Sequence, residues 1–219
     1  MNNLKKSIKL ISYSVGVKRQ IAMSLVFLAI GIGIEICTGC SNVLGGFYIA
    51  LIGTVPAQMI LLVTVPSAVK ASPFYRKITV DMFGFLIFLS ELFCFTVVAL
   101  IHGIYAAITP ENADVSYTIV LLVAAVVFLT EAITPLMYKH YWAAFFILLV
   151  CVWGLFMPCG AYIYGDESLH LAVWVYYLAG YVLVLLGMLV GMLVNRVFYK
   201  HELDPMTYKS MMKKLDGSL

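Results

Sequence analysis

The stretch MFGFLIFLSELFCFTVVALIHGIYAAI, from Met82 to Ile108, decides the fold class of this chain. Its only acidic or basic side chains are Glu91 and His102. A helix rises 1.5 Å per residue and needs about 20 apolar residues to cross a bilayer, so this run is long enough. No water is available inside a bilayer, and a helix satisfies its own backbone hydrogen bonds there. The stretch therefore predicts a transmembrane helix.

Further apolar runs of similar length occupy most of the chain. Its 219 residues are 63% hydrophobic and 11% charged, whereas soluble domains are near half apolar and about a quarter charged. We therefore predict an all-α integral membrane protein with an interfacial segment at 1–20, a six-span domain at 21–194 and a basic tail at 195–219. The expected spans are 21–40, 44–65, 82–108, 117–136, 142–163 and 169–194.

The lysines and arginines predict the orientation of the spans. All 14 fall in the first 20 residues, in the loops after the second and fourth spans, or in the tail. The remaining three connections hold none, and two of them hold acids: Glu111 with Asp114, and Asp166 with Glu167. The positive-inside rule then puts both termini in the cytoplasm of a multi-pass cell-membrane protein. The orientation of the spans and contact with anionic lipid headgroups account for the cations, so no nucleic acid is expected as a partner.

The first 20 residues predict an amphipathic helix in the headgroup layer. Apolar side chains are spaced i, i+4, i+7 and i+11, and lysines lie off that stripe. A basic anchor that only fixes orientation is the simpler interpretation of the same pattern. The residues assigned to this membrane-surface helix are Leu4, Lys5, Lys6, Ile8, Lys9, Ile11 and Val15.

The stretch VPSAVKASPFYRKITVD, Val65 to Asp81, interrupts the apolar sequence between the second and third spans. Its serine suits a helix N-cap and the following proline suits the first helical position. An aromatic pair then supplies contact area and two cations supply charge. We interpret the segment as a short cytoplasmic docking helix, and a solvated basic loop is the alternative. The residues of the docking helix are Ser72, Pro73, Phe74, Tyr75, Arg76 and Lys77.

These features together resemble a permease subunit of the type-2 ABC exporter class. In that family an interfacial elbow helix precedes six spans, and the loop between the second and third spans forms a coupling helix on a separate ATPase subunit. The resemblance implies that Leu4 to Val15 correspond to the elbow and that "ASPFYRKI" contains the coupling helix. Relatives often carry re-entrant helical structure between the fifth and sixth spans, whereas that connection is very short here.

The resemblance implies an ATP-driven exporter of an amphipathic substrate, such as a peptide, a lipid-like molecule or a drug. The sequence has no G-x-x-x-x-G-K-[ST] motif, so ATP and Mg²⁺ would be held by a partner ATP-binding subunit and this chain would carry no cofactor. A second permease copy or a homologue would complete the path. No membrane-enzyme signature is present in the sequence, so no catalytic residue is assigned and no enzymatic activity is expected. A vitamin-type binding subunit of an uptake system and an ion- or proton-coupled carrier centred on Glu91 remain as alternatives.

Four ionisable side chains inside the expected spans are functional candidates, because such groups are costly in lipid. Glu91 lies nearest the middle of its span and suits either a proton relay or a hydrogen-bonded contact between helices. A structural role is favoured for the other three, which lie nearer to the ends of their spans or stand alone. The intramembrane candidates are Glu91, Glu35, Glu131 and His102.

Cysteine and glycine spacings give weaker signals. Cys37-Thr-Gly-Cys40 has C-x-x-C spacing, but no second such pair or neighbouring histidine completes a zinc site, so small packing residues are expected and no metal. Gly187-Met-Leu-Val-Gly191 permits close helix approach, within one bundle or between two chains. Ala29 and Gly33 form a looser pair of this kind, and Pro158 is expected to kink the fifth span.

Overall fold

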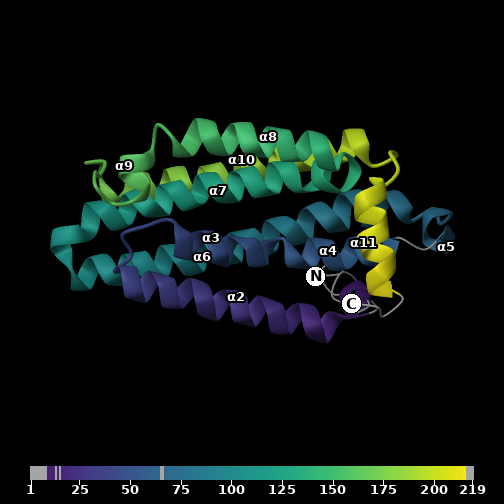
Figure 1. Cartoon of the computed structure of the whole chain (residues 1–219), viewed down its shortest axis with the longest axis horizontal. Helices are drawn as coiled ribbons and strands as arrows, with labels where there is room; N and C mark the ends of the chain where they lie inside the picture. Colours follow the sequence, from purple (N-terminus) through teal and green to yellow (C-terminus); the bar gives the residue numbers. More distant parts are fainter. Residues whose placement is uncertain (1–8, 13, 15, 65–66, 216–219) are drawn as a thin grey trace.

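The computed structural model describes residues 9–12, 14, 16–64 and 67–215, and every regular element in them is a helix. The long helices run side by side in one elongated bundle (Figure 1). The all-helical prediction is therefore confirmed. The elements are α2 (Val17–Thr38), α3 (Leu44–Gly53), α4 (Val55–Thr64), α5 (Ser67–Lys70), the π-helix η1 (Lys77–Met82), α6 (Phe83–Ile108), the 3₁₀ helix η2 (Pro110–Asn112), α7 (Ala113–Lys139), α8 (Tyr141–Phe156), α9 (Gly160–Ile163), α10 (Val173–Phe198) and α11 (Pro205–Leu215).

Among the described residues, five helical stretches are long and apolar enough to cross a bilayer. The expected fifth span is not one continuous helix, because α8 ends at Phe156 and a turn through Pro158 separates it from α9. Proline lacks the N–H that would continue the hydrogen-bond ladder and its ring clashes with the preceding turn. The five stretches are Val17–Thr38, Leu44–Thr64, Lys77–Ile108, Pro110–Lys139 and Val173–Phe198.

The second apolar stretch is broken at Thr54, between α3 and α4. The break precedes Pro56, which has no N–H to donate to the carbonyl of Ile52. At the break, the Thr54 hydroxyl donates to the Leu51 carbonyl at 2.9 Å. The sequence analysis treated 44–65 as one uninterrupted helix and did not anticipate this joint.

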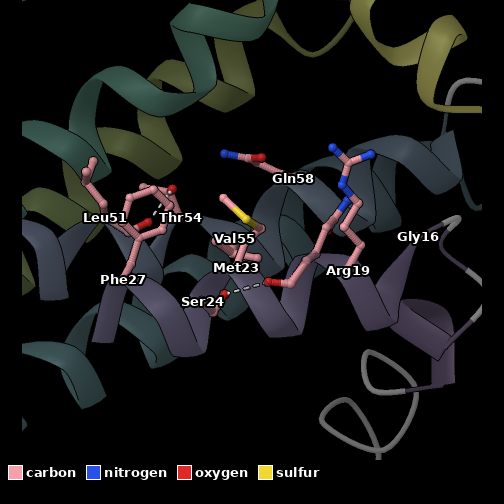
Figure 2. A pocket seen from close by; sticks show the side chains of 10 residues that line it. Gly16, Arg19, Met23, Ser24, Phe27, Leu51, Thr54, Val55 and Gln58 are labelled. Atoms are coloured by element: carbon pink, nitrogen blue, oxygen red, sulfur yellow. Dashed lines mark hydrogen bonds between the residues drawn. The ribbon is translucent and has the colours of Figure 1, made fainter. Parts of the chain in front are cut away.

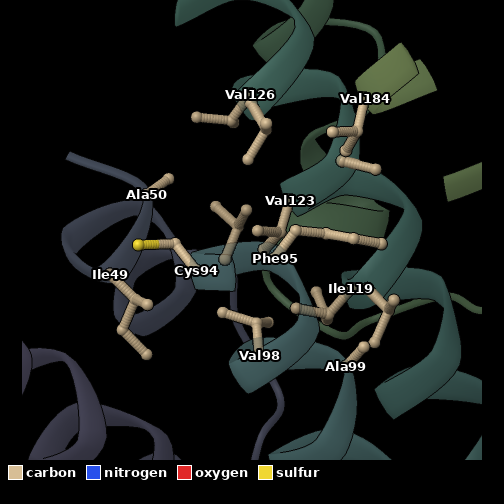
Figure 3. Packing of buried hydrophobic residues seen from close by; sticks show 14 of the residues in the cluster. Ile49, Ala50, Cys94, Phe95, Val98, Ala99, Ile119, Val123, Val126 and Val184 are labelled. Carbon is tan, nitrogen blue, oxygen red and sulfur yellow. The ribbon is translucent and has the colours of Figure 1, made fainter. Parts of the chain in front are cut away.

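The main hydrophobic core lies where α3, α6, α7 and α10 meet (Figure 3). Small residues allow these helices to approach closely: a Cβ at Gly180 would lie 2.6 Å from the Phe95 ring. The helix α10 packs along α7, α6 contacts both α7 and α3, and α2 packs chiefly on α3. Core residues with almost no exposed surface are Ile49, Phe95, Val98, Ile119, Val120, Val123, Val127 and Val184.

A second hydrophobic cluster, which we call the terminal cluster, lies at the end of the bundle where the described parts of both chain ends meet. Its buried residues come from α4, η1 and the first half of α6. Leu10 and Ile11 from the N-terminal side pack on it, as do Leu203 and Met212 from the C-terminal side. The tail thus contains a helix, α11, which crosses this end of the bundle (Figure 1) and which the sequence analysis did not identify. The buried residues of the terminal cluster are Ala57, Ile60, Leu61, Leu62, Met82, Phe83, Leu86 and Ile87.

Charge is distributed unevenly between the two ends of the bundle. All the lysines and arginines among the described residues lie at the end that carries α5 and α11, which we call the cationic end. The opposite end carries η2 and the α9–α10 connection, with Glu111, Asp114, Asp166 and Glu167. His170 pairs with Asp114 there, at 2.8 Å between Nδ1 and Oδ2.

Candidate functional site

The expected docking segment does not form a separate helix over 72–77. It consists of α5, a turn at 71–74, and a helix that resumes at Tyr75 and continues through η1 into α6. The Ser72 hydroxyl accepts the Phe74 N–H at 3.2 Å, and the Ser72 carbonyl accepts the Tyr75 N–H at 3.0 Å. The serine and proline therefore build a turn that leads into the third apolar stretch, rather than a cap for a free helix.

The aromatic pair of this segment is divided between two environments. Phe74 is 64% exposed, whereas Tyr75 is half-buried, and burial raises the pKa of the Tyr75 phenol above its usual value. Arg76 and Lys77 are exposed. Within this segment, Phe74 is therefore the large apolar side chain that is exposed next to the two cations.

The tail holds the docking segment in place, which the sequence analysis missed. The Arg76 guanidinium lies 5.8 Å from the centre of the Tyr199 ring, and the Lys70 ammonium lies 5.8 Å from the centre of the Tyr208 ring. Cation–π contacts of this kind favour a defined position for exposed cations. The tail is also joined to the end of α7, because the buried Lys139 ammonium donates to the His201 carbonyl at 2.7 Å.

Only part of the expected membrane-surface helix falls within the described residues. Residues 9–12 are helical, with Lys9 exposed and Ile11 half-buried against the terminal cluster. Ile11 therefore contacts the protein itself. The remaining assigned residues, Leu4, Lys5, Lys6, Ile8 and Val15, lie outside the described residues.

The three glutamates that were expected inside the spans are fully buried, and each packs against a glycine of a neighbouring helix. A Cβ at Gly45 would lie 2.6 Å from the Glu35 carboxylate, and a Cβ at Gly187 would lie 2.5 Å from Oε2 of Glu131. The glycines supply the space that the carboxyl groups fill. The pairs are Glu35 with Gly45, Glu91 with Gly53, and Glu131 with Gly187.

Glu91 lies beside the joint between α3 and α4. Its Oε1 accepts the Thr130 hydroxyl at 3.3 Å, and Oε2 has no hydrogen-bond partner among the described residues. The adjacent Ser90 hydroxyl lies 2.5 Å from the Gly53 carbonyl, at the end of α3. Glu131, the next residue on α7, turns its carboxyl group toward Gly187 of α10 instead, and neither of its oxygens has a hydrogen-bond partner among the described residues. Buried carboxyl groups of this kind can hold a proton or a small cation inside the bundle.

Glu35 and His102 meet at the opposite end of the bundle, where Nε2 of His102 lies 3.2 Å from Oε2 of Glu35. Cys40 and Ser116 complete this buried cluster. The sequence analysis found no histidine beside the C-x-x-C pair, but the fold brings one there from α6.

Gly187 and Gly191 both face α7 within the same bundle. A Cβ at Gly191 would lie 2.5 Å from the Glu131 carbonyl oxygen. The two glycines therefore permit the close approach of α10 to α7. Of the two interpretations left open by the spacing, the structure describes the contact within one chain.

A groove of about 420 Å³ opens between α2 and the α3–α4 joint (Figure 2). Arg19 of α2 and Gln58 of α4 lie toward its cationic end, and Phe27 and Leu51 lie further along. The groove thus combines polar groups at one end with an apolar wall. Thr54, at the joint, lies on its surface.

No family model, characterised protein or solved structure matches this chain.

Proposed function

We propose that this chain is the membrane-spanning permease subunit of a transporter driven by a separate ATPase. In this proposal the six spans are α2, α3–α4, η1–α6, α7, α8–α9 and α10, and both termini are cytoplasmic. The observation that carries the proposal is Phe74, which is 64% exposed at the cationic end, two residues before Arg76, whose guanidinium lies over the Tyr199 ring of the tail. A large exposed aromatic side chain beside cations is typical of an anchor residue in a protein interface.

The charge distribution supports the cytoplasmic position of this anchor. Cations concentrate on the cytoplasmic side of membrane proteins, and the described lysines and arginines share one end of the bundle with Phe74. A soluble ATPase subunit reaches a membrane protein from that side. The substrate class in this proposal is amphipathic, because the groove in Figure 2 presents Arg19 and Gln58 at one end and is lined further along by both apolar side chains and Thr54.

The lipid-facing helices suit a pathway shared with a second copy or a homologue. Exposed apolar side chains cover α2, α8 and α10, and α8 packs chiefly on α7. Such surfaces bind either lipid or another transmembrane helix. Representative exposed side chains are Leu25, Ile30, Phe146, Trp153, Leu178 and Leu186.

The proposal is tested by purifying the chain from its native membranes and identifying a nucleotide-hydrolysing chain that accompanies it. Phe74→Ala is expected to reduce that association, because the anchor loses its contact area. Tyr164→Ala is the matched control, since Tyr164 is 70% exposed at the opposite end. Arg76→Ala with Lys77→Ala is expected to weaken association mainly at low salt, because exposed charges are screened. Absence of any ATPase chain from the wild-type preparation would contradict the proposal.

A proton-coupled carrier is the second candidate, and the Glu91–Thr130 contact beside the α3–α4 joint favours it. A carboxyl group at a helix break can exchange a proton when the joint moves. Proton flux in vesicles that contain the purified chain without ATP tests this candidate. Flux that Glu91→Gln abolishes would replace the ATPase-driven proposal.

A further inference from the structure

A buried cluster of ligand-type side chains lies at the end of the bundle opposite the cations. Glu35 comes from the last turns of α2, Cys40 from the turn after it, and His102 from α6. All three side chains are buried, and their potential ligand atoms lie within 4.8 Å of one another. The set combines one carboxylate, one thiol and one imidazole, which is a ligand combination that zinc accepts.

The hydrogen bonds of Ser116 determine which nitrogen of His102 is available. The Ser116 hydroxyl donates to the His102 carbonyl at 3.2 Å, so its oxygen accepts from the His102 ring at 2.9 Å. In this arrangement Nδ1 carries the hydrogen and the neutral ring presents the Nε2 lone pair to the cluster, which is the tautomer that a metal ligand requires. A partner that holds the other ring nitrogen in this way is typical of histidines that bind metals.

With this tautomer, two hydrogen-bond acceptors face each other. The Nε2 lone pair of His102 lies 3.2 Å from Oε2 of Glu35. Neither Nε2 nor either carboxylate oxygen of Glu35 has a hydrogen-bond partner among the described residues. Two acceptors at this distance in a buried setting require a positive centre between them, which is a proton or a metal ion.

The backbone at Cys40 gives a second, independent observation. Cys40 has φ +52°, the left-handed region that suits glycine, and it is the one non-glycine residue with positive φ among the described residues. Its N–H donates to the Glu35 carbonyl at 2.9 Å, which closes the end of α2. A residue with a side chain has a higher conformational energy at positive φ than at negative φ. Residues with such strained backbone conformations cluster at functional sites. The thiol that results is buried beside Glu35 and His102.

We propose that Glu35, Cys40 and His102 bind a zinc ion that ties the α2–α3 turn to α6. Glu35 binds as a carboxylate, His102 through Nε2, and Cys40 as a thiolate whose proton is released to water. The two negative ligands neutralise the charge of a divalent ion, which removes the cost of burying the carboxylate. This inference is independent of the proposed transport function.

The spacing of the ligand atoms suits a tetrahedral ion. Bonds of about 2.0–2.3 Å keep tetrahedral ligand atoms about 3.3–3.7 Å apart, close to the 3.2 Å between His102 and Glu35. The Cys40 sulfur lies within 4.8 Å of the other two ligand atoms, so it has to move by at most about 1 Å to reach a tetrahedral ligand–ligand distance. Three protein ligands leave the fourth position for water or another small ligand.

Metal analysis of the purified full-length chain in detergent tests the proposal. After removal of metals with a chelator, dialysis against Zn²⁺ is expected to load one ion per chain. Loading with Co²⁺ is expected to give a thiolate-to-cobalt absorption band, which reports the Cys40 sulfur directly. Cys40→Gly is expected to abolish both signals, and Ser116→Ala to weaken zinc affinity about 10–100-fold by releasing the His102 ring.

Two controls separate loss of the ligand from loss of the fold. Cys37→Ser changes the exposed cysteine of the same C-x-x-C pair and is expected to leave zinc and cobalt binding unchanged. Glycine suits the backbone at position 40, so metal-free Cys40→Gly should unfold at no lower temperature than the metal-free wild type. Zinc should raise the unfolding temperature of the wild type and not that of Cys40→Gly. Absence of zinc from the wild type, or equal binding by Cys40→Gly, would overturn the proposal in favour of a proton shared by Glu35 and His102.

Discussion

Gly191→Ala is expected to separate α10 from α7 and to destabilise the bundle. The added Cβ would lie 2.5 Å from the Glu131 carbonyl oxygen and 3.1 Å from its carbonyl carbon. Both atoms belong to the backbone, so no side-chain rotation relieves the overlap and the helices must move apart. Overpacking costs about 1–3 kcal/mol, and replacing glycine by alanine in a helix returns about 0.5–1 kcal/mol. The middles of these two ranges give an expected net loss of about 1 kcal/mol.

Gly33→Ala is the matched variant, because no heavy atom lies within 4 Å of the position that its Cβ would take. It should keep the gain in helix propensity, up to about 1 kcal/mol, without an overlap. The measurement is the midpoint of denaturation in detergent for both variants beside the wild type. A stable Gly191→Ala variant would refute the described α7–α10 contact. An equal loss in Gly33→Ala would show that another molecule covers that face of α2.

Three further outcomes are expected. Reporter fusions within 67–80 should read cytoplasmic and fusions within 110–116 should read outside, because cations mark the inner side; the reverse pattern would overturn the orientation. Glu91→Gln should keep the fold in a detergent melt, whereas Glu91→Leu should lose about 1–3 kcal/mol by pressing a branched side chain against its glycine neighbour; transport that becomes independent of pH only in the glutamine variant would give Glu91 a protonatable role. Lys139→Met should speed proteolysis after Lys200, because the ammonium no longer holds the His201 carbonyl; an unchanged cleavage rate would show that this hydrogen bond does not fix the tail.

Hydropathy predicted the helical class and most of the long helices, because a bilayer imposes helix length directly. It did not predict the joint at Thr54, although Pro56 carried the signal. It also missed α11, for which Asp204 and Pro205 form a recognisable start: the Asp204 carboxylate accepts the Met206 N–H at 2.9 Å.

The contacts between side chains of different helices could not be predicted from the sequence. A helix that is apolar on all sides gives no periodic signal of which face points inward. Glu35 and His102 lie on separate helices, and their contact depends on how each helix is rotated about its axis. The same holds for the glycines that accommodate the glutamates. Spacing within one segment found Cys37 and Cys40, but only the fold distinguishes the exposed cysteine from the buried one.

The helix α3 lies between the proposed zinc site and Glu91. Its ten residues span about 15 Å, with Gly45 against Glu35 at one end and Gly53 against Glu91 at the other. The docking segment leads instead into the terminal cluster, to which α4 belongs, on the far side of the Thr54 joint.

Phe74 and His102 are connected through η1 and α6, and their separation of 28 residues corresponds to about 42 Å of helix. Sites that share no contacting residues usually respond additively to substitution. Phe74→Ala should bind zinc as tightly as the wild type, and Cys40→Gly should keep its association with the ATPase subunit. Loss of zinc in Phe74→Ala would show that the bundle moves as one unit and that α6 transmits the change from one end to the other.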